Sequence, residues 1–325
     1  MKHLILWFIF AVLLIINISI AHSQTRDNRL NRFEFKEYHM GVDVRIVVYS
    51  QDKDQAERAC AAAFERFAEL DSIMSDYRID SELMRLSAKS GDKPVVVSKD
   101  LFIVLQRAQE VAERSQGAFD VTCGPLISLW RTCRKTGVLP SEEALTKAKT
   151  LVGWRNIVLD SKRLAVFLLK SGMRLDLGGI GKGYADDCAM SVLKKHGIRS
   201  ALIEAGGDIL VSAPPPDQSG WKITLANAAT PGQSADLSLA DCAISTSGDT
   251  EQSVSIGGKR FSHIIDPRSG QALTDRIQVT IIAKNGLTSD SLSTAVSVLG
   301  KVQGEKLVQT YSRTSSFIRL IPALQ

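Results

Sequence analysis

The sequence predicts a single α+β domain behind a short N-terminal export segment. Some segments carry apolar residues at helical spacing, such as Asp54 to Ser72, and others alternate at strand spacing, such as Met40 to Ser50. The two kinds of element are mixed without a strict βαβ alternation, which favours α+β over a parallel α/β sheet. The chain has 325 residues, of which 44% are hydrophobic and 23% charged, so it can bury a sizeable core.

The first 23 residues differ from the rest of the chain. Lys2 and His3 precede an apolar run over 4–20, and Ala21-His22-Ser23 places small residues at the two positions that a signal peptidase recognises. We therefore expect residues 1–23 to be a signal peptide, residues 24–32 a flexible tail and residues 33–325 the folded domain. The alternative is an uncleaved membrane anchor, because the apolar run approaches the length that spans a bilayer. In either case we expect the domain on the periplasmic side of the inner membrane.

Charge and cysteine content narrow the classes of function. The net charge of +5 comes from 40 basic and 35 acidic residues spread along the chain, so no nucleic-acid partner is expected. The expected mature chain has no Cys-x-x-Cys pair, and we expect buried free thiols, with one disulfide as the alternative. Its five cysteines are Cys60, Cys123, Cys133, Cys188 and Cys242.

The elements of the N-terminal half follow from periodicity and capping residues. The strand over 40–50 turns Val42, Val44, Ile46 and Val48 to one face. Ser98 is a good N-cap for a long helix. The elements expected next are an amphipathic helix over Asp54–Ser72, a short helix opened by Asp80-Ser81-Glu82, helices over Ser98–Ser115 and Ser141–Thr150, and two strands within Asn156–Phe167.

Glycine and proline mark the boundaries in the C-terminal half. A strand over 173–177 runs into a glycine loop over 178–183, and the helix that follows is stopped by Gly197. Three consecutive prolines follow Ala213 and predict a surface turn. The other expected elements are a helix over Tyr184–His196, a strand over Ala201–Glu204, several strands within 221–283, and a helix over Ser289–Leu299 ended by Gly300.

The glycine loop is the sharpest local motif. A strand that passes through glycines into a helix N-terminus directs unpaired backbone N–H groups at one point, and Lys182 adds a cation, so the loop is a candidate phosphate site. It matches neither the Walker A nor the Rossmann pattern. The alternative is a tight turn that binds nothing.

Four further candidates are side chains or a short segment that could bind a ligand or take part in a reaction. Asp290 and Thr294 are four residues apart and share a helix face, where a carboxylate and a hydroxyl suit Mg²⁺; the alternative is a capped helix start facing solvent. His263 precedes an Asp-Pro turn and is a candidate general base, or a structural histidine. Tyr77 suits stacking on a planar ring or simple packing. The 245–249 segment, rich in hydroxyls, suits an anion site or a turn.

In this order the motifs resemble the ApbE-like family of FAD:protein FMN transferases, over residues 33–325. The matching blocks are Met40-Gly41, Ser75–Arg78 with Asp80–Leu83, Gly117–Trp130, Leu175–Asp186, Glu204–Asp208, Ser245–Asp249, His263–Gly270 and Ser289–Gly300. The resemblance implies one α+β, T-fold-like domain with the FAD and metal sites in a central cleft. Thr250 stands where the family often has an aromatic residue, which affects the expected local flavin or acceptor contacts.

The resemblance also implies roles for individual residues. His263 would be the catalytic base. Mg²⁺ would be held by Asp290 and Thr294, with a backbone carbonyl near Gly179. The residues implied to bind FAD are Met40, Tyr77, Ala118, Phe119, Asp120, Asp176, Lys182 and Ile265.

The implied reaction moves FMN from FAD to a Thr or Ser hydroxyl of an exported redox protein and releases AMP. Two alternatives remain open. One is a pyrophosphatase that splits FAD into FMN and AMP with water, and the other is a non-enzymatic exported flavin-binding protein.

Overall fold

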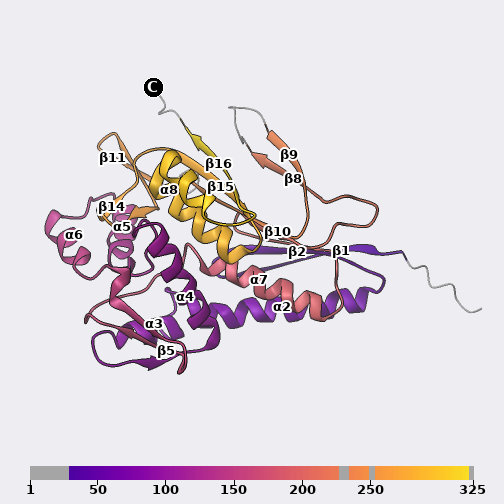
Figure 1. Ribbon diagram of the computed structural model, residues 1–325, viewed down its shortest axis with the longest axis horizontal. Helices are drawn as coiled ribbons and strands as arrows, with labels where there is room; N and C mark the ends of the chain where they lie inside the picture. Colours follow the sequence, from indigo (N-terminus) through magenta and orange to yellow (C-terminus); the bar gives the residue numbers. More distant parts are fainter. Residues whose placement is uncertain (1–28, 227–233, 249–252, 322–325) are drawn as a thin grey trace, which may run out of the picture.

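A seven-stranded sheet organises the computed structural model, which describes residues 29–226, 234–248 and 253–321 (Figure 1). Every neighbouring pair in this sheet is antiparallel. Its strand order is β1 (Asn31–His39), β2 (Val42–Ser50), β6 (Ala201–Ala205), β7 (Asp208–Val211), β10 (Cys242–Gly248), β15 (Ile277–Ala283) and β16 (Ser315–Leu320).

The helices and smaller strands complete the domain. The helices are α2 (Lys53–Met74), α3 (Glu82–Ala88), α4 (Lys99–Arg114), α5 (Gly124–Thr136), α6 (Glu142–Lys149), α7 (Gly181–Lys195) and α8 (Gly286–Gln309). A 3₁₀ turn, η1, covers Trp154–Asn156. The smaller sheets are β3 (Val95–Val96) with β5 (Ala165–Leu168) and β4 (Ile157–Asp160), β8 (Trp221–Ala226) with β9 (Ser234–Leu239), β11 (Ser253–Ile256) with β12 (Lys259–Ser262), and β13 (Ile265–Asp266) with β14 (Gln271–Ala272).

The two faces of the large sheet pack against different layers. On β2, the buried side chains of Val44, Ile46 and Val48 join the main core with α2, α7 and α8. Val47, between them, faces the opposite side and packs with Trp221 of the β8–β9 hairpin. In Figure 1 this hairpin lies on the side of the sheet away from α2 and α7. Each fully buried aliphatic side chain contributes about 1.5–3 kcal/mol, so the alternation on β2 fixes its register.

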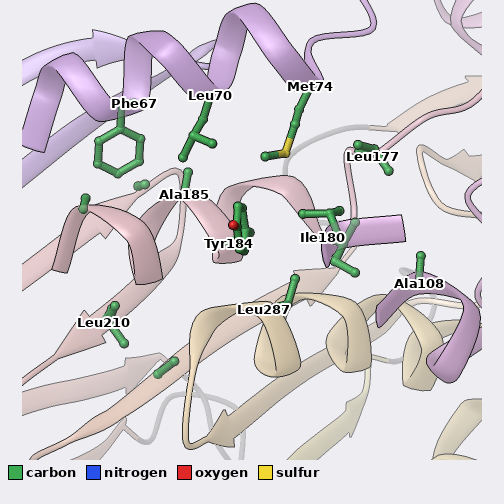
Figure 2. Packing of buried hydrophobic residues seen from close by; sticks show 14 of the residues in the cluster. Phe67, Leu70, Met74, Ala108, Leu177, Ile180, Tyr184, Ala185, Leu210 and Leu287 are labelled. Carbon is green, nitrogen blue, oxygen red and sulfur yellow. The ribbon is translucent and has the colours of Figure 1, made fainter. Parts of the chain in front are cut away.

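Helix α7 lies in the middle of the helical layer. Figure 2 shows it between α2 and α8, with Leu70 and Met74 of α2 on one side and Leu287 of α8 on the other. Ala185 and Ile180 are completely buried there. Because both flanks of α7 are covered, the glycine turn that precedes it has a fixed place in the domain.

Most sequence-predicted elements are present, with shifted ends. The Ser98 hydroxyl accepts a hydrogen bond from Leu101 N–H, which confirms the predicted N-cap. Helix α7 begins at Gly181, so half of the predicted loop is helical. Helix α8 begins at Gly286; Gly300 breaks it with a positive φ of 71°, as predicted, but helical backbone continues to Gln309. All five cysteines are free thiols, as predicted, but only Cys60 and Cys133 are fully buried.

Four segments differ from the sequence interpretation. Residues 173–177, predicted as a strand, contain only an isolated bridge between Arg174 and Cys123. β1 begins at Asn31, inside the range predicted as a flexible tail. The segment after Cys123, for which no helix was predicted, is helix α5 with Pro125 in its first turn. Residues 245–248 form a strand rather than a turn, because their backbone pairs with β15, and the hydroxyls of residues 245–247 bond to side chains of neighbouring elements. The predicted signal peptide, Asp249 and Thr250 lie outside the described residues.

Within the described residues, no helix combines the length and apolarity needed to cross a membrane.

Candidate functional site

Helices α7 and α8 cross at two glycines, and this crossing creates the site. A Cβ atom built on Gly183 would overlap the carbonyl oxygen of Gly286, and one on Gly286 would overlap that of Gly183. The Asp187 carboxylate of α7 accepts hydrogen bonds from the N–H groups of Gly286 (2.8 Å) and Leu287 (2.9 Å), so α7 caps the start of α8. The contact places the second turn of α8 directly beside the first turn of α7.

Asp290 is brought to the glycine turn by this crossing. It is 3% exposed, and its Oδ2 accepts a hydrogen bond of 3.0 Å from Gly183 N–H. Its Oδ1 lies 3.9 Å from Lys182 Nζ, which is beyond hydrogen-bond distance. Burial, opposed by Lys182 and assisted by Asp208, raises the pKa of Asp290 to about 7. The alternative interpretation of a carboxylate on a solvent-facing helix start is therefore wrong.

Thr294 completes the predicted metal triad with Asp290 and Gly179. A Cβ atom on Gly179 would lie 2.8 Å from Thr294 Oγ1, so the hydroxyl touches the backbone of the turn and only glycine fits there. Ser289 and Ser293, on the same helix, bond to Ser245 (2.8 Å) and Ser247 (2.7 Å) of β10. These bonds hold α8 against the sheet through the face next to the one that carries Asp290 and Thr294.

The donor chemistry of this triad fits a hard divalent cation. The carboxylate oxygen Oδ1 of Asp290, the hydroxyl of Thr294 and the backbone at Gly179 are oxygen donors from two adjacent elements, and Mg²⁺ takes few protein ligands and keeps several waters. In residues 29–226, 234–248 and 253–321, no group of three or more His, Cys, Asp and Glu side chains is arranged to hold a metal ion. The candidate site differs from such a group, because it has one carboxylate and its other ligands would be uncharged oxygen atoms.

Lys182 lies among several carboxyl groups rather than in solvent. Its Nζ is 2.7 Å from Asp208 Oδ2. Burial lowers the pKa of Lys182, but Asp208 and Asp290 raise it above the ordinary value. Asp186 is 1% exposed, its Oδ1 has no hydrogen-bond partner among the described residues, and burial together with Asp208 holds its pKa well above the usual range. One ammonium therefore faces an excess of carboxyl groups, an arrangement that a divalent cation would help to balance.

The backbone amides of the glycine turn are largely used within the protein. Gly178 N–H donates to Asp176 Oδ1 (2.9 Å), and Gly183 N–H donates to Asp290. Ile180 and Gly181 both donate to the carbonyl of Leu177. The prediction that the turn presents unpaired amides is wrong for these four, because the adjacent carboxylates and the chain reversal use them.

Asp176 and Tyr77 are connected through Arg131, which the sequence interpretation did not single out. Arg131 of α5 forms ion pairs with Asp76 and with Asp176 Oδ2, the latter at 3.0 Å. Its guanidinium carbon also lies 4.4 Å from the centre of the Tyr77 ring. Burial and the Asp76 charge raise the pKa of Asp176 to about 6, while Arg131 lowers it. Tyr77 is 80% exposed, so its ring is available to a ligand and is not core packing.

The other predicted FAD residues fall into two groups. Met40, at a positive φ of 50°, has its Cε 3.8 Å from the position of a Cβ on Gly181, so it lies against the glycine turn. Ala118 and Phe119 are buried, and Asp120 accepts hydrogen bonds from Thr122 N–H, Thr122 Oγ1 and Trp154 N–H. Asp120 therefore holds the 118–122 turn against η1.

His263 and Ile265 lie in the β12–β14 region. Ile265 is 7% exposed and packs in a small core with Leu126 and Trp130 of α5. His263, between β12 and β13, is partly buried. Trp130 Nε1 donates a hydrogen bond to the carbonyl of Gly270 (3.0 Å). A Cβ atom built on Gly117 would lie 3.9 Å from Arg268 Cγ. The 263–270 loop therefore sits against α5 and the 117–120 turn.

Sequence reasoning missed Arg131, Asp187 and Asp208 as site residues. Asp208 follows two glycines that predict a turn, but its pairing with Lys182 depends on β7 lying beside α7. Arg131 follows Trp130 directly, yet nothing local distinguishes it from the other arginines of the chain. In each case the partner is distant in sequence, so no short-range pattern could identify it.

Fold and site together define a single-domain α+β protein with a candidate cation site between a glycine turn and a buried carboxylate. A family model described as the ApbE family matches residues 40–318. The chain belongs to the ApbE family.

Named relatives and solved structures agree with this assignment. A protein named FAD:protein FMN transferase from Treponema pallidum is 31% identical over 313 residues, covering 91% of this chain and 84% of the relative. The crystal structure of Pseudomonas stutzeri flavinyl transferase ApbE, apo form, superposes with a TM-score of 0.81 at 28% identity and covers 91% of this chain and 93% of that one. The ApbE protein of Thermotoga maritima gives a TM-score of 0.76 at 30% identity, covering 86% and 90%. The predicted α+β fold is confirmed.

Proposed function

We propose that the protein is a Mg²⁺-dependent FAD:protein FMN transferase, which moves FMN from FAD to a Ser or Thr hydroxyl of an exported redox protein and releases AMP. The observation that carries the proposal is the buried Asp290 carboxylate, held beside Lys182 and the glycine turn by the α7–α8 crossing. The chain belongs to a family in which relatives from Treponema pallidum and Vibrio cholerae are named FAD:protein FMN transferase, and this supports the transferase class.

The site meets the physical demands of phosphoryl transfer. Breaking the bond between the two phosphates of FAD places negative charge on the departing AMP oxygen, and such reactions ask the protein mainly for positioning and charge neutralisation. Asp290, Thr294 and the backbone at Gly179 would hold Mg²⁺, which would neutralise charge on the pyrophosphate. Lys182 supplies a fixed positive charge in the same place. Met40, against the turn, and the exposed ring of Tyr77 offer apolar surface to the rest of FAD.

His263 is the proposed base. It would take the proton of the acceptor hydroxyl as the oxygen forms its bond to the FMN phosphorus, while the bond to the AMP oxygen breaks and its electron pair leaves with AMP. The segment after His263 packs on α5 through Ile265 and Gly270. Helix α5 also carries Arg131, which lies against Tyr77, and this supports a place for His263 near the proposed flavin site.

Substitution of Asp290 tests the proposal. We expect Asp290→Asn to lose about 10²-fold or more in the rate of FMN attachment, because a charged donor to the metal is replaced by a neutral one. The reaction contains purified enzyme, FAD, MgCl₂ and a recombinant acceptor, with FMN attachment followed by mass spectrometry and AMP by chromatography. Glu305→Gln, which removes an exposed carboxylate from the same helix, is the matched control and retains activity. Normal attachment by Asp290→Asn would contradict the assignment.

The same assay separates the two alternatives. Rapid AMP release with FAD and MgCl₂ but no acceptor identifies a pyrophosphatase. Tight binding of FAD that stays intact with Mg²⁺ and acceptor present identifies a flavin-binding protein without enzymatic activity.

Export is part of the proposal and is supported by the N-terminal pattern alone. We expect the mature protein in the periplasmic fraction to begin after Ser23, and co-expression with exported redox proteins to yield one that carries covalent FMN. An N-terminus at Met1 in the membrane fraction would favour the anchor.

A further inference from the structure

Tyr77 is a solvent-exposed aromatic residue on a loop, yet its ring is held from one side. The loop connects α2 to α3, with Ser75 ending the first helix and Ser81 capping the second. The Tyr77 side chain is 80% exposed, so the protein core does not restrain it. The Arg131 guanidinium lies 4.4 Å from the ring centre, within the range of a cation–π contact. With one face on Arg131 and most of the ring accessible, the opposite face is open.

Arg131 is itself fixed by two carboxylates from different parts of the site. One nitrogen, Nη1, donates to Asp76, the residue before Tyr77. The other, Nη2, donates to Asp176 Oδ2 at 3.0 Å. Asp176 uses its second oxygen to accept the hydrogen bond from Gly178 in the glycine turn. One side chain of α5 therefore joins the Tyr77 loop to the turn that precedes α7.

A second arginine, Arg174, also holds the loop that carries Tyr77. Arg174 donates from Nη2 to the backbone carbonyl of Asp76 at 3.1 Å. Asp76 is thus held through both its side chain and its backbone, and Tyr77 follows it directly. The planar guanidinium is suited to this task, because it can pair with carboxylates at its edge while its face stacks on an aromatic ring.

We propose that Arg131 is a positioning residue for the flavin substrate: it backs one face of Tyr77 so that the other face receives a planar ring of FAD. This inference rests on the proposed function. Arg131 does not touch the reacting atoms and acts through Tyr77. Its bonds to Asp76 and Asp176 also fix the position of the Tyr77 ring relative to the glycine turn, where the phosphates of FAD are proposed to bind.

The test measures FAD affinity rather than transfer alone. We expect Arg131→Met to bind FAD about tenfold more weakly, a factor that corresponds to about 1.4 kcal/mol, and to quench the fluorescence of bound flavin less than the wild type does. KM for FAD should rise by a similar factor while kcat changes less. Arg114→Met is the matched control, because it removes a guanidinium that lies 4.6 Å from the Tyr311 ring elsewhere in the molecule. The control should bind FAD normally.

A double-mutant cycle shows whether Arg131 acts through Tyr77. In a Tyr77→Ala background, Arg131→Met should weaken FAD binding no further. Full additivity of the two substitutions would overturn the proposal. Should Arg131→Met fail to fold in a thermal melt, Arg131→Lys takes its place, since it keeps a positive charge between the carboxylates and loses only the planar face; wild-type affinity and quenching in Arg131→Lys would then overturn the proposal.

The outcome for the wild type separates this inference from the proposed function. If the wild-type protein does not bind FAD with Mg²⁺ present, the proposed function fails. If it binds FAD and transfers FMN, but Arg131→Met has unchanged affinity and quenching, only the role of Arg131 fails.

Discussion

Lys182 illustrates how a single residue in this site depends on its neighbours. Its ammonium is 2.7 Å from Asp208 and 3.9 Å from Asp290, and Asp186 is buried nearby. Both Asp208 and Asp290 are almost completely inaccessible to solvent. A buried ion pair contributes little net stability, but breaking it from one side leaves an uncompensated charge. Lys182 is thus a structural counter-ion as well as a candidate phosphate ligand.

Removing Lys182 should therefore destabilise the protein. We expect Lys182→Met to lower the free energy of unfolding by about 3–5 kcal/mol at neutral pH, measured by urea denaturation without Mg²⁺. The double substitution Lys182→Met with Asp208→Asn should recover part of this loss, because the unpaired charge is removed. A double variant that is less stable than Lys182→Met would contradict the ion-pair interpretation.

His263 gives a second prediction at this scale, on activity rather than stability. We expect His263→Ala to slow FMN attachment by about 10²–10⁴-fold, the usual contribution of a general base, while its affinity for FAD stays within about twofold of wild type. Calorimetry measures the affinity and single-turnover mass spectrometry the rate. Equal loss of rate in His196→Ala, a histidine at the end of α7, would point to a general effect of histidine removal.

At the scale of elements, the crossing of α7 and α8 decides the geometry of the site. Gly183 and Gly286 let the two backbones meet, and Asp187 bonds to the first amides of α8. The crossing sets where Asp290 lies relative to the glycine turn. A helix pair separated by ordinary side chains would be 8–10 Å apart, about the spacing of typical helix packing, and Asp290 could not reach Gly183 N–H.

We expect Gly183→Ala to lower the free energy of unfolding by about 1–3 kcal/mol, the typical cost of overpacking, because its methyl group would overlap the Gly286 backbone and lie 2.7 Å from Asp290 Cβ. Transfer activity should fall as well, since Asp290 moves with α8. Ser191→Ala, on the exposed face of α7, is the control and should change stability by less than about 0.5 kcal/mol. Wild-type stability in Gly183→Ala would show that the helices can separate without cost.

At the scale of the whole molecule, the layered architecture buries ionisable groups that the unfolded chain exposes. Burial raises the pKa of Asp187 to about 6, although the amides of Leu287 and Gly286 lower it. The folded protein then holds this proton more firmly than the unfolded chain does. The contribution of Asp187 to stability is fully present below pH about 4 and is lost as the pH rises through about 6.

Asp187→Asn should remove this pH dependence. We expect the unfolding free energy of the wild type, relative to Asp187→Asn, to fall by on the order of 2 kcal/mol between pH 4 and pH 7, at about 1.4 kcal/mol per unit of pKa difference. Urea denaturation across this range, without Mg²⁺, provides the measurement. A difference between the two proteins that stays constant with pH would show that Asp187 titrates normally.

Local signals determined which elements form and which residues are candidates for the chemistry. The alternation on β2, the Ser98 cap and the break at Gly300 all depend on near neighbours in the chain, so periodicity and capping rules could find them. Asp290 and Thr294 stood out because a spacing of four on a helix is itself a short-range property, but the spacing alone left their role open and the family resemblance implied the metal. The order of the motifs was sufficient for the family resemblance that the comparisons confirm.

Only the tertiary structure decided which of these residues meet. Helix α5 was not expected from its sequence because its start, Gly124-Pro125, is typical of a turn, and it is packing of Leu126 and Trp130 that stabilises it. The pairing of Lys182 with Asp208, and of Arg131 with Asp76 and Asp176, joins residues far apart in the chain. Such contacts follow from the order of strands in the sheet and the crossing of two helices, which depend on the burial of the whole core and not on any single segment.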